Sequence, residues 1–186
     1  MGFVKPSPRW TKDGNRYTIR TAQVSDAEQM HKLTKSALKE GTGLVMSYDD
    51  FHMTVNDQMM KNDFTLRNPH TLQLIAVKKN IVIGILTIDI DGLKHTMHRG
   101  TLGVIIHPSY RSKGVGKALM TTALFWAHHF APLEKLELEV LSSNQKAIKL
   151  YERLGFFYEG RIHRFMRKTN GEYEDILTMG CFLLKT

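Results

Sequence analysis

A basic turn punctuated by glycines, at residues 111–118, constrains the fold of this chain more than any other feature. It follows an apolar run at 102–106 and precedes a pattern in which Leu119, Ala123 and Trp126 recur at helical spacing. This order predicts a buried strand that enters a helix through a glycine loop. The free N–H groups of a first helical turn and the positive end of the helix dipole attract anions, and glycine lets a phosphate approach the backbone closely. The loop therefore predicts a phosphate-binding site.

Two common nucleotide-binding motifs do not fit this loop. A nucleoside-triphosphate loop would end in Gly-Lys-Ser/Thr, whereas Gly116 and Lys117 are followed by Ala118. A dinucleotide-binding loop would need a third glycine and an acidic residue about 20 positions further on, and only Gly114 and Gly116 are present. The arrangement Arg111-x-x-Gly114-x-Gly116 is similar instead to Arg/Gln-x-x-Gly-x-Gly/Ala, the pyrophosphate loop of the GNAT N-acetyltransferase superfamily.

A second segment, at residues 144–156, strengthens the resemblance. It is similar to the other coenzyme A signature of that superfamily, Asn-x-x-Ala-x-x-x-Tyr-x-x-x-Gly-Phe, which is carried here by Asn144, Ala147, Tyr151 and the pair Gly155-Phe156. The two motifs stand in the order in which the superfamily has them. The likeness extends over most of the chain, because 17–22 resembles the usual opening strand and 83–86 resembles the third strand.

The resemblance implies a fold class of α/β (α+β) type, with a single GNAT domain over residues 1–186. We expect a central mixed, mostly antiparallel sheet of about seven strands flanked by helices. The sequence pattern predicts strands near 17–22, 71–78, 81–90, 99–106, 134–140, 156–167 and 172–184, and helices near 25–39, 49–61, 114–129 and 144–154.

Composition is consistent with one compact domain. The chain has 186 residues, of which 42% are hydrophobic, and no Pro/Gly/Ser-rich linker divides it. The single cysteine, Cys181, excludes an intramolecular disulfide and fits a reducing compartment. No apolar run approaches the roughly 20 residues that a membrane-spanning helix needs, and the first residues lack an apolar signal core. We expect a cytoplasmic protein without a membrane partner.

The formal net charge of +8 raises the question of a nucleic-acid partner. The basic residues are scattered among acidic ones, and none forms a basic motif interleaved with aromatic residues, so we expect no nucleic-acid binding. Arg111, Lys113, Lys117, Lys146 and Lys149 lie in or beside the two motifs. Coenzyme A brings several phosphate charges to such positions, which accounts for part of the excess.

The resemblance also implies the coenzyme-binding residues, which come from the fourth strand, the glycine loop and the second motif. These are Val104, Ile106, Arg111, Ser112, Lys113, Gly114, Val115, Gly116, Lys117, Ala118, Asn144, Lys146, Ala147 and Tyr151. Acetyl-CoA is thus the expected cosubstrate, and no metal is expected.

The base that would neutralise an attacking amine is less directly indicated. Many GNAT enzymes place a glutamate on the fourth strand, where this chain has Thr101, and a hydroxyl would only relay a proton through water. The nearest titratable substitutes are His98, just ahead of that strand, and Glu137 and Glu139 on the next one. Alternation places both glutamates on the opposite face from the leucines of that strand. Glu139 is the first candidate, His98 the second, and a purely solvated role is the alternative.

Tyr151 is the candidate residue that assists the departure of the coenzyme A thiolate. It lies on the same helical face as Ala147 and Leu154, so a packed aromatic residue with a satisfied hydroxyl is the structural alternative. The resemblance implies a position near the thioester sulfur, where the hydroxyl would act as a general acid. A phenol is a weaker acid than a thiol, so a hydrogen bond to the developing sulfur charge would supply much of the effect.

These observations predict an N-acetyltransferase that moves an acetyl group from acetyl-CoA to a primary amine of a small molecule or amino acid by direct attack. Two alternatives stay open: an enzyme that acetylates protein N-termini or lysines, and a non-catalytic regulator that binds acyl-CoA. The expected partners are acetyl-CoA and an amine acceptor, with a homodimer as an open alternative.

Overall fold

The structure is a computed structural model that describes residues 3–41, 43–44, 46–90, 92–168 and 170–183. Its centre is one eight-stranded sheet with the strand order β1-β2-β3-β4-β5-β6-β8-β7. The strands are β1 (Ser7–Trp10), β2 (Arg16–Thr21), β3 (Leu72–Lys78), β4 (Ile81–Asp89), β5 (Arg99–Ile106), β6 (Lys135–Leu141), β7 (Phe157–Arg167) and β8 (Tyr173–Phe182). The helices are α1 (Ala27–Lys39), α2 (Val55–Arg67), α3 (Val115–Phe130) and α4 (Gln145–Arg153), with short 3-10 turns at Val24–Asp26 and Pro108–Tyr110.

The expected fold class is confirmed. Every neighbouring pair of described strands is antiparallel except β5 with β6, which is parallel, so the sheet is mixed and mostly antiparallel. The expected strands and three of the four expected helices lie within about two residues of their predicted bounds.

Two expectations about the elements were wrong. The sheet has one strand more than expected, because the short β1, which contains Pro8, pairs with β2 at the sheet edge. Proline is confined to such edges because it cannot donate to a second neighbour, and this makes the strand hard to recognise. The helix expected at 49–61 is α2, which begins only after Thr54, because the Thr54 side chain accepts a hydrogen bond from the Asp57 N–H and the Asp57 side chain accepts one from the Thr54 N–H.

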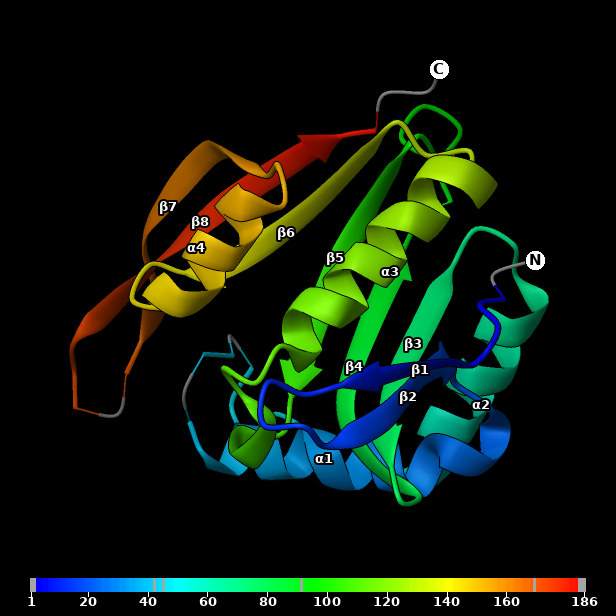
Figure 1. The fold of residues 1–186 in the computed structure, drawn as a ribbon. Helices are drawn as coiled ribbons and strands as arrows, with labels where there is room; N and C mark the ends of the chain where they lie inside the picture. Colours follow the sequence, from blue (N-terminus) through cyan, green and yellow to red (C-terminus); the bar gives the residue numbers. More distant parts are fainter. Residues whose placement is uncertain (1–2, 42, 45, 91, 169, 184–186) are drawn as a thin grey trace.

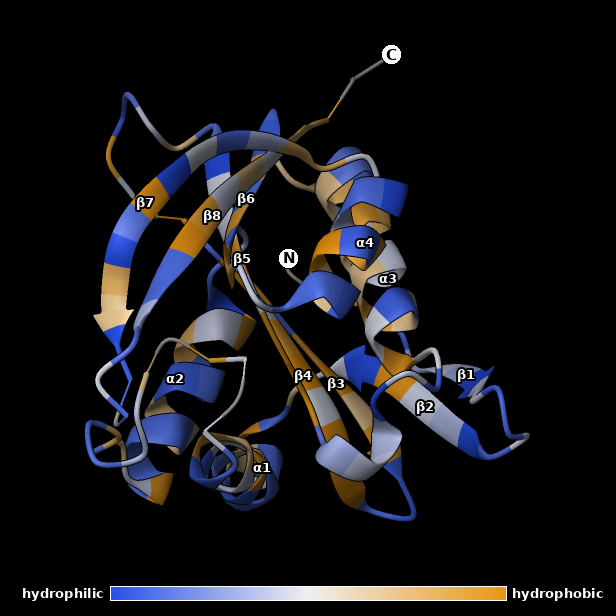
Figure 2. Ribbon diagram, turned by 90° about the vertical axis from the view of Figure 1, so that its left-hand side faces the viewer, coloured by the Kyte–Doolittle hydropathy of each residue, from blue (hydrophilic) through white to orange (hydrophobic). Residues whose placement is uncertain are grey.

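Both faces of the sheet are covered by helices (Figure 1), and α1 and α2 lie on the opposite side from α3 and α4. Successive β3 residues supply the two cores in alternation. Leu74 packs in a cluster with Leu119 and Trp126 of α3, whereas Ile75 packs in a second cluster with Met30 of α1. Figure 2 shows β3 and β4 as mainly hydrophobic strands between the two helical layers, as expected for strands that are buried on both faces.

The sheet is interrupted at its only parallel pair. The ladder between β5 and β6 has three pairs, from Arg99 opposite Lys135 to Thr101 opposite Glu137. Beyond them β5 continues to pair with β4 and β6 continues to pair with β8, so each strand keeps one partner. Figure 1 shows the two strands separating toward the end where β5 leads into α3. Along this separation the facing backbone groups of residues 102–106 have no ladder partner in the described chain.

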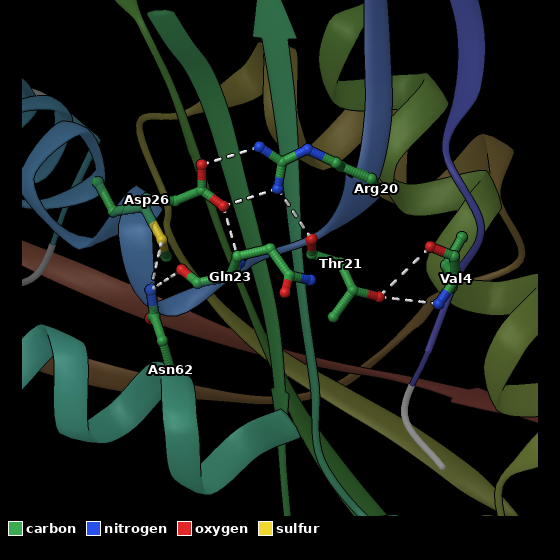
Figure 3. Close-up of polar contacts among 7 residues, drawn as sticks. Val4, Arg20, Thr21, Gln23, Asp26 and Asn62 are labelled. Atoms are coloured by element: carbon green, nitrogen blue, oxygen red, sulfur yellow. Dashed lines mark hydrogen bonds and ion pairs between the residues drawn. The ribbon is translucent and has the colours of Figure 1, made fainter. Parts of the chain in front are cut away.

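A polar network fastens the start of α1 to the sheet and to α2 (Figure 3). Arg20 of β2 donates to both carboxylate oxygens of Asp26, at 2.6 and 2.8 Å. The Gln23 N–H also donates to Asp26, while the buried Asn62 side chain of α2 donates to the Gln23 carbonyl at 2.8 Å. Burial would raise the pKa of Asp26, but the hydrogen bonds from Arg20 and Gln23 and the charge of Arg20 outweigh it, so the pKa is lowered.

Replacement of Asp26 by Asn tests this network. The side chains of Arg20 and Asp26 are 26% and 13% exposed, so the bidentate pair is only partly screened by water. We expect Asp26→Asn to lower the free energy of unfolding by about 1–3 kcal/mol at pH 7, measured by urea denaturation. Glu28→Gln, which breaks the exposed pair with Lys32, is the matched control and should cost less than about 1 kcal/mol.

The difference in unfolding free energy between the parent and Asp26→Asn should depend on pH in a defined direction. The folded-state pKa of Asp26 lies below the unfolded value of about 3.9. Its stabilising effect is therefore present above pH 4 and is lost as the pH falls through the folded-state pKa. The difference between the parent and Asp26→Asn should shrink in acid, and a difference that stays constant down to pH 2 would contradict the role given to the ion pair.

Candidate active site

The glycine loop places the start of α3 at the open end of the β5–β6 separation. Gly114 is the N-cap of α3 with a φ of 92°, and the first helical hydrogen bond joins the Ala118 N–H to the Gly114 carbonyl. The N–H groups of Val115, Gly116 and Lys117 precede that bond and have no partner within the helix. They lie at the helix end where the sequence predicts anion binding.

The two glycines of the loop differ in whether their backbone conformation and surroundings allow a side chain. Gly114 has a left-handed backbone in which side chains are strained, although a Cβ there would meet only the Lys12 side chain, at 3.9 Å. Gly116 has a helical backbone, and a Cβ would lie 3.7 Å from Ile106 and 3.8 Å from Leu150, which is ordinary contact. The protein itself therefore has room for a single Cβ at position 116.

Two basic side chains of the loop are already paired with carboxylates. The Arg111 Nη2 atom lies 2.6 Å from Glu40 Oε2 at the end of α1, and Lys113 Nζ lies 2.9 Å from Asp13 Oδ2 in the β1–β2 turn. Hydrogen bonds from Thr11 and Lys113 hold the pKa of Asp13 far below its ordinary value. Lys117 is exposed and has no carboxylate partner within the described residues, as is also true of Lys146 and Lys149 on α4. A bound phosphate therefore has to compete with Glu40 and Asp13.

The second motif forms α4, which lies beside β6 (Figure 1). Asn144 caps this helix, because its side chain accepts from the Ala147 N–H at 3.3 Å. The turn before it is fastened to β8 by Glu174, which accepts from the Ser142 hydroxyl and the Ser143 N–H at 2.9 Å each. A hydrogen bond from Lys168 is the main reason that the pKa of Glu174 is lowered to about 2. A permanently ionised carboxylate thus fixes the start of the motif.

Tyr151 lies on the inner side of α4. Its side chain is 6% exposed, and its ring centroid lies 6.0 Å from that of Phe156. Its hydroxyl makes no hydrogen bond to another described residue. Burial raises the pKa of Tyr151 to about 12, so the hydroxyl keeps its proton at neutral pH. The alternative, a packed tyrosine whose hydroxyl is hydrogen-bonded by the protein, therefore does not match the described residues.

Glu139 lies on the other face of the sheet. It is exposed on β6, opposite Thr178 of β8 and two residues beyond the last β5–β6 pair. Together with Thr101 and Thr178 it lines a cavity of about 320 Å³. The inward-facing neighbours Leu138 and Val140 pack against the α3 and α4 side, as the alternation predicts.

Four further charged residues line the same cavity, and they pair with one another. Lys135 contacts Glu137 at 2.7 Å and Glu159 at 2.6 Å, and Arg99 lies 3.1 Å from Glu137. Burial would raise the pKa of Glu137, but the hydrogen bond and charge of Lys135 and the charge of Arg99 lower it. Glu139 has no ion pair in the part of the chain that the structure describes. It is therefore the cavity carboxylate without a cationic partner among the described residues.

The other candidate base lies apart from this group. His98 is exposed just before β5 and does not line the cavity, and its carbonyl accepts from the backbone of Glu134 and Lys135. Residue 106, where β5 ends next to the glycine loop, lies about 26 Å further along the strand. The structure thus brings Glu139 and Thr101 together and leaves His98 at the far end.

Sequence reasoning did not identify the carboxylates that hold the loop, Glu40 and Asp13, or the cavity residues contributed by β7 and β8, Glu159 and Thr178. No motif marks them, because each lies on an element far away in sequence. Within the described ranges no group of three or more His, Cys, Asp or Glu side chains is placed to hold a metal ion. No helix among the described residues is both long and apolar enough to cross a membrane.

Comparison with known proteins identifies the class to which this site belongs. The model of the Acetyltransferase (GNAT) family matches residues 30–156. The L-amino acid N-acetyltransferase AaaT of Escherichia coli K12 is 32% identical over 111 residues, which are 60% of this chain and 68% of that protein. A crystal structure of a GNAT-family acetyltransferase from Streptococcus pneumoniae superimposes with a TM-score of 0.84 and 28% identity, covering 89% of this chain and 99% of the other.

A third similar protein is yncA of Salmonella typhimurium, a putative acetyltransferase whose structure contains its cofactor acetyl-CoA. It has a TM-score of 0.81 and 18% identity, and the match covers 91% of this chain and 95% of that one. The chain belongs to the GNAT acetyltransferase family. It is an acetyltransferase that uses acetyl-CoA, as the resemblance implied.

The loop geometry yields a graded prediction at position 116. Gly116→Ala adds a Cβ in ordinary contact and should leave acetyl-CoA affinity within about threefold of the parent. Gly116→Val adds two methyl groups next to the free N–H groups and should weaken binding by at least about tenfold, or 1.4 kcal/mol, without a matching loss of stability. Calorimetric titration with acetyl-CoA and thermal unfolding measure the two quantities. If Gly116→Val binds acetyl-CoA as tightly as Gly116→Ala does, the loop is not the phosphate-binding site.

Proposed function

We propose that the protein transfers the acetyl group of acetyl-CoA to a primary amine of a small molecule or amino acid by direct attack. The observation that carries this proposal is the β5–β6 separation, with the buried Tyr151 of α4 on the helical face of the sheet and Glu139 on the other face. Neither side chain has a hydrogen-bond or ion-pair partner among the described residues, and we infer that donor and acceptor approach the separation from opposite faces. The likeness to an amino acid N-acetyltransferase supports a small amine acceptor.

Acetyl-CoA, the acetyl donor, is bound mainly by backbone groups. The N–H groups of Val115, Gly116 and Lys117 bind the pyrophosphate. Arg111 and Lys113 leave their carboxylate partners, Glu40 and Asp13, and pair with the phosphate charges instead. The edge of β5 beyond the ladder, which includes Val104 and Ile106, offers backbone groups to the amides of the pantetheine arm, although the Ile106 carbonyl already accepts from Arg111 Nε at 3.2 Å. Asn144, Lys146 and Ala147 present the start of α4 to the same molecule, and Ser112 and Ala118 complete the loop around it.

The acceptor side has to supply a neutral amine. An amine with a pKa of about 10.4 is only about 0.04% neutral at pH 7. Glu139 lies in the cavity without a cationic partner, so it attracts the ammonium form and accepts its proton directly or through water. Thr101 lies on the strand across the separation and orients such a water by hydrogen bonding.

Tyr151 stabilises the charge that develops on the leaving sulfur. As the amine nitrogen bonds to the acetyl carbon, the carbon–sulfur bond breaks, the nitrogen releases its second proton to water to give the amide, and negative charge develops on sulfur. The Tyr151 pKa of about 12 lies well above the thiol value of about 8.5, so complete proton transfer from the phenol is uphill. The hydroxyl therefore acts by donating a hydrogen bond to the developing thiolate, and solvent protonates the thiolate afterwards.

The experiment that tests the function is a screen for acetyl-dependent thiol release. Small primary amines, free amino acids, and peptides with free N-termini or lysines are offered as acceptors, and products are confirmed by mass spectrometry. Turnover of small amines or amino acids supports the proposal. Turnover of peptides alone assigns the enzyme to protein acetylation, and acetyl-CoA binding without any turnover identifies a regulator. A homodimer and a cytoplasmic location stay predictions.

Tyr151→Phe tests the sulfur side, because it retains the ring and removes only the hydroxyl. The unfolding free energy and acetyl-CoA affinity should change little, whereas the single-turnover rate should fall about a hundredfold, the effect of losing one donor to developing charge. Tyr158→Phe is the matched control, since that hydroxyl is exposed and bonds only to Glu152. An unchanged rate for Tyr151→Phe would make Tyr151 a packing residue.

Glu139→Gln tests the acceptor side. The substitution keeps the size of the side chain and removes its charge and basicity. We expect kcat/KM for the amine to fall by about 10²–10⁴ near pH 7 and to recover partly at high pH, where the free amine is neutral without help. Glu152→Gln on α4, outside the cavity, is the control. A loss that persists unchanged at pH 10 would contradict a proton-accepting role.

A further inference from the structure

A groove runs along the outer side of α3, and the loop residues Gly114, Lys117 and Ala118 line the part of it that adjoins the candidate coenzyme site. The groove has a volume of about 880 Å³ and lies between that helix and the N-terminal segment that leads into β1. Phe3, Phe125, Trp126 and Phe130 give it a largely apolar lining. Phe3, Phe125 and Phe130 are 52%, 57% and 65% exposed, which is a concentration of large apolar side chains that no described element covers.

The groove also contains basic groups. Lys5, Arg9 and Lys117 are its charged lining residues, and no carboxylate is among the residues that line it. None of the three has a carboxylate partner within the described ranges, in contrast to Arg111 and Lys113 of the neighbouring loop. The groove therefore has a net positive potential that no part of the described chain neutralises.

The basic lining residues are spread along the groove, because Lys5 is two residues from Phe3 whereas Lys117 lies in the first turn of α3. Figure 1 shows β1 running toward the end where α3 begins, and the Lys12 N–H donates to the Lys113 carbonyl at 3.0 Å there. The N-terminal segment and α3 thus run in opposite directions, so the order of residues predicts Arg9 near the start of α3 and Phe3 nearer its end. Lys117 and Phe130 are 13 positions apart on α3, which corresponds to about 20 Å of helix.

We propose that this groove binds a single-chain anionic amphiphile of the fatty-acid type. Its carboxylate would pair with Arg9, and its hydrocarbon chain would lie along Phe125 toward Phe130 and Phe3. Charge complementarity selects the anionic head group, and the length of the apolar lining selects a long chain. The inference does not depend on the acceptor or on the catalytic roles proposed for Glu139 and Tyr151.

Calorimetric titration of the full chain with dodecanoate tests the proposal. We expect saturable binding at one site in the micromolar range, no measurable binding of acetate, and at least tenfold weaker binding of dodecylammonium. Phe125→Ser and Arg9→Glu should each weaken dodecanoate binding at least about tenfold. Phe64→Ser, at a phenylalanine of similar exposure on α2, and Arg167→Glu on β7 are matched controls and should bind as the parent does.

Four results would overturn the proposal. They are the absence of dodecanoate binding, equal binding by Phe125→Ser and Arg9→Glu, binding only to anionic vesicles, and a dimer that Phe125→Ser dissociates while dodecanoate has no effect. A further control uses coenzyme A. If it displaces dodecanoate completely and Arg9→Glu weakens both ligands equally, the groove belongs to the coenzyme site. Acetyl transfer by Phe125→Ser should match the parent, which keeps this test distinct from that of the proposed function.

Discussion

The early end of the parallel β5–β6 ladder is the constraint on which the rest of this structure depends. A sheet with eight strands would ordinarily pair every interior edge along its length, because an unpaired backbone group that is buried is costly. Here the ladder ends after three pairs, while β5 stays paired with β4 and β6 stays paired with β8. The separation can persist because a ligand with its own amides can occupy it. Packing of α3 and α4 on one face keeps both strands in place.

The separation gives each face of the sheet its own chemical character. On the helical face the start of α3 offers unbonded N–H groups and α4 offers a buried phenol whose pKa is raised to about 12. On the other face the cavity is lined by three carboxylates, the Lys135 ammonium and the Arg99 guanidinium, and only Glu139 among the carboxylates lacks an ion pair within the described residues. The proposed function uses this difference, because it brings an anionic donor and a cationic acceptor to opposite faces of the sheet.

Carboxylates outside the two motifs set the geometry of both. Glu40 and Asp13 hold Arg111 and Lys113, and Glu174 holds the turn that precedes α4. These contacts link α1, the β1–β2 turn and β8 to the coenzyme-binding segments. Because Arg111 and Lys113 already have carboxylate partners, a phosphate that displaced Glu40 and Asp13 would gain less than the number of basic residues in the loop implies.

The sequence by itself determined the family, the strand–loop–helix unit around Gly114, most element boundaries and the candidate role of Tyr151. These follow from local periodicity, turn chemistry and two contiguous motifs, all of which act over a few residues. Only the tertiary structure decided that Glu139 rather than His98 shares a cavity with Thr101, and that Glu40 and Asp13 pair with the loop. It also placed the short edge strand β1 beside β2. Each of these depends on strand register and helix docking between distant segments, and no pattern within one segment records such a contact.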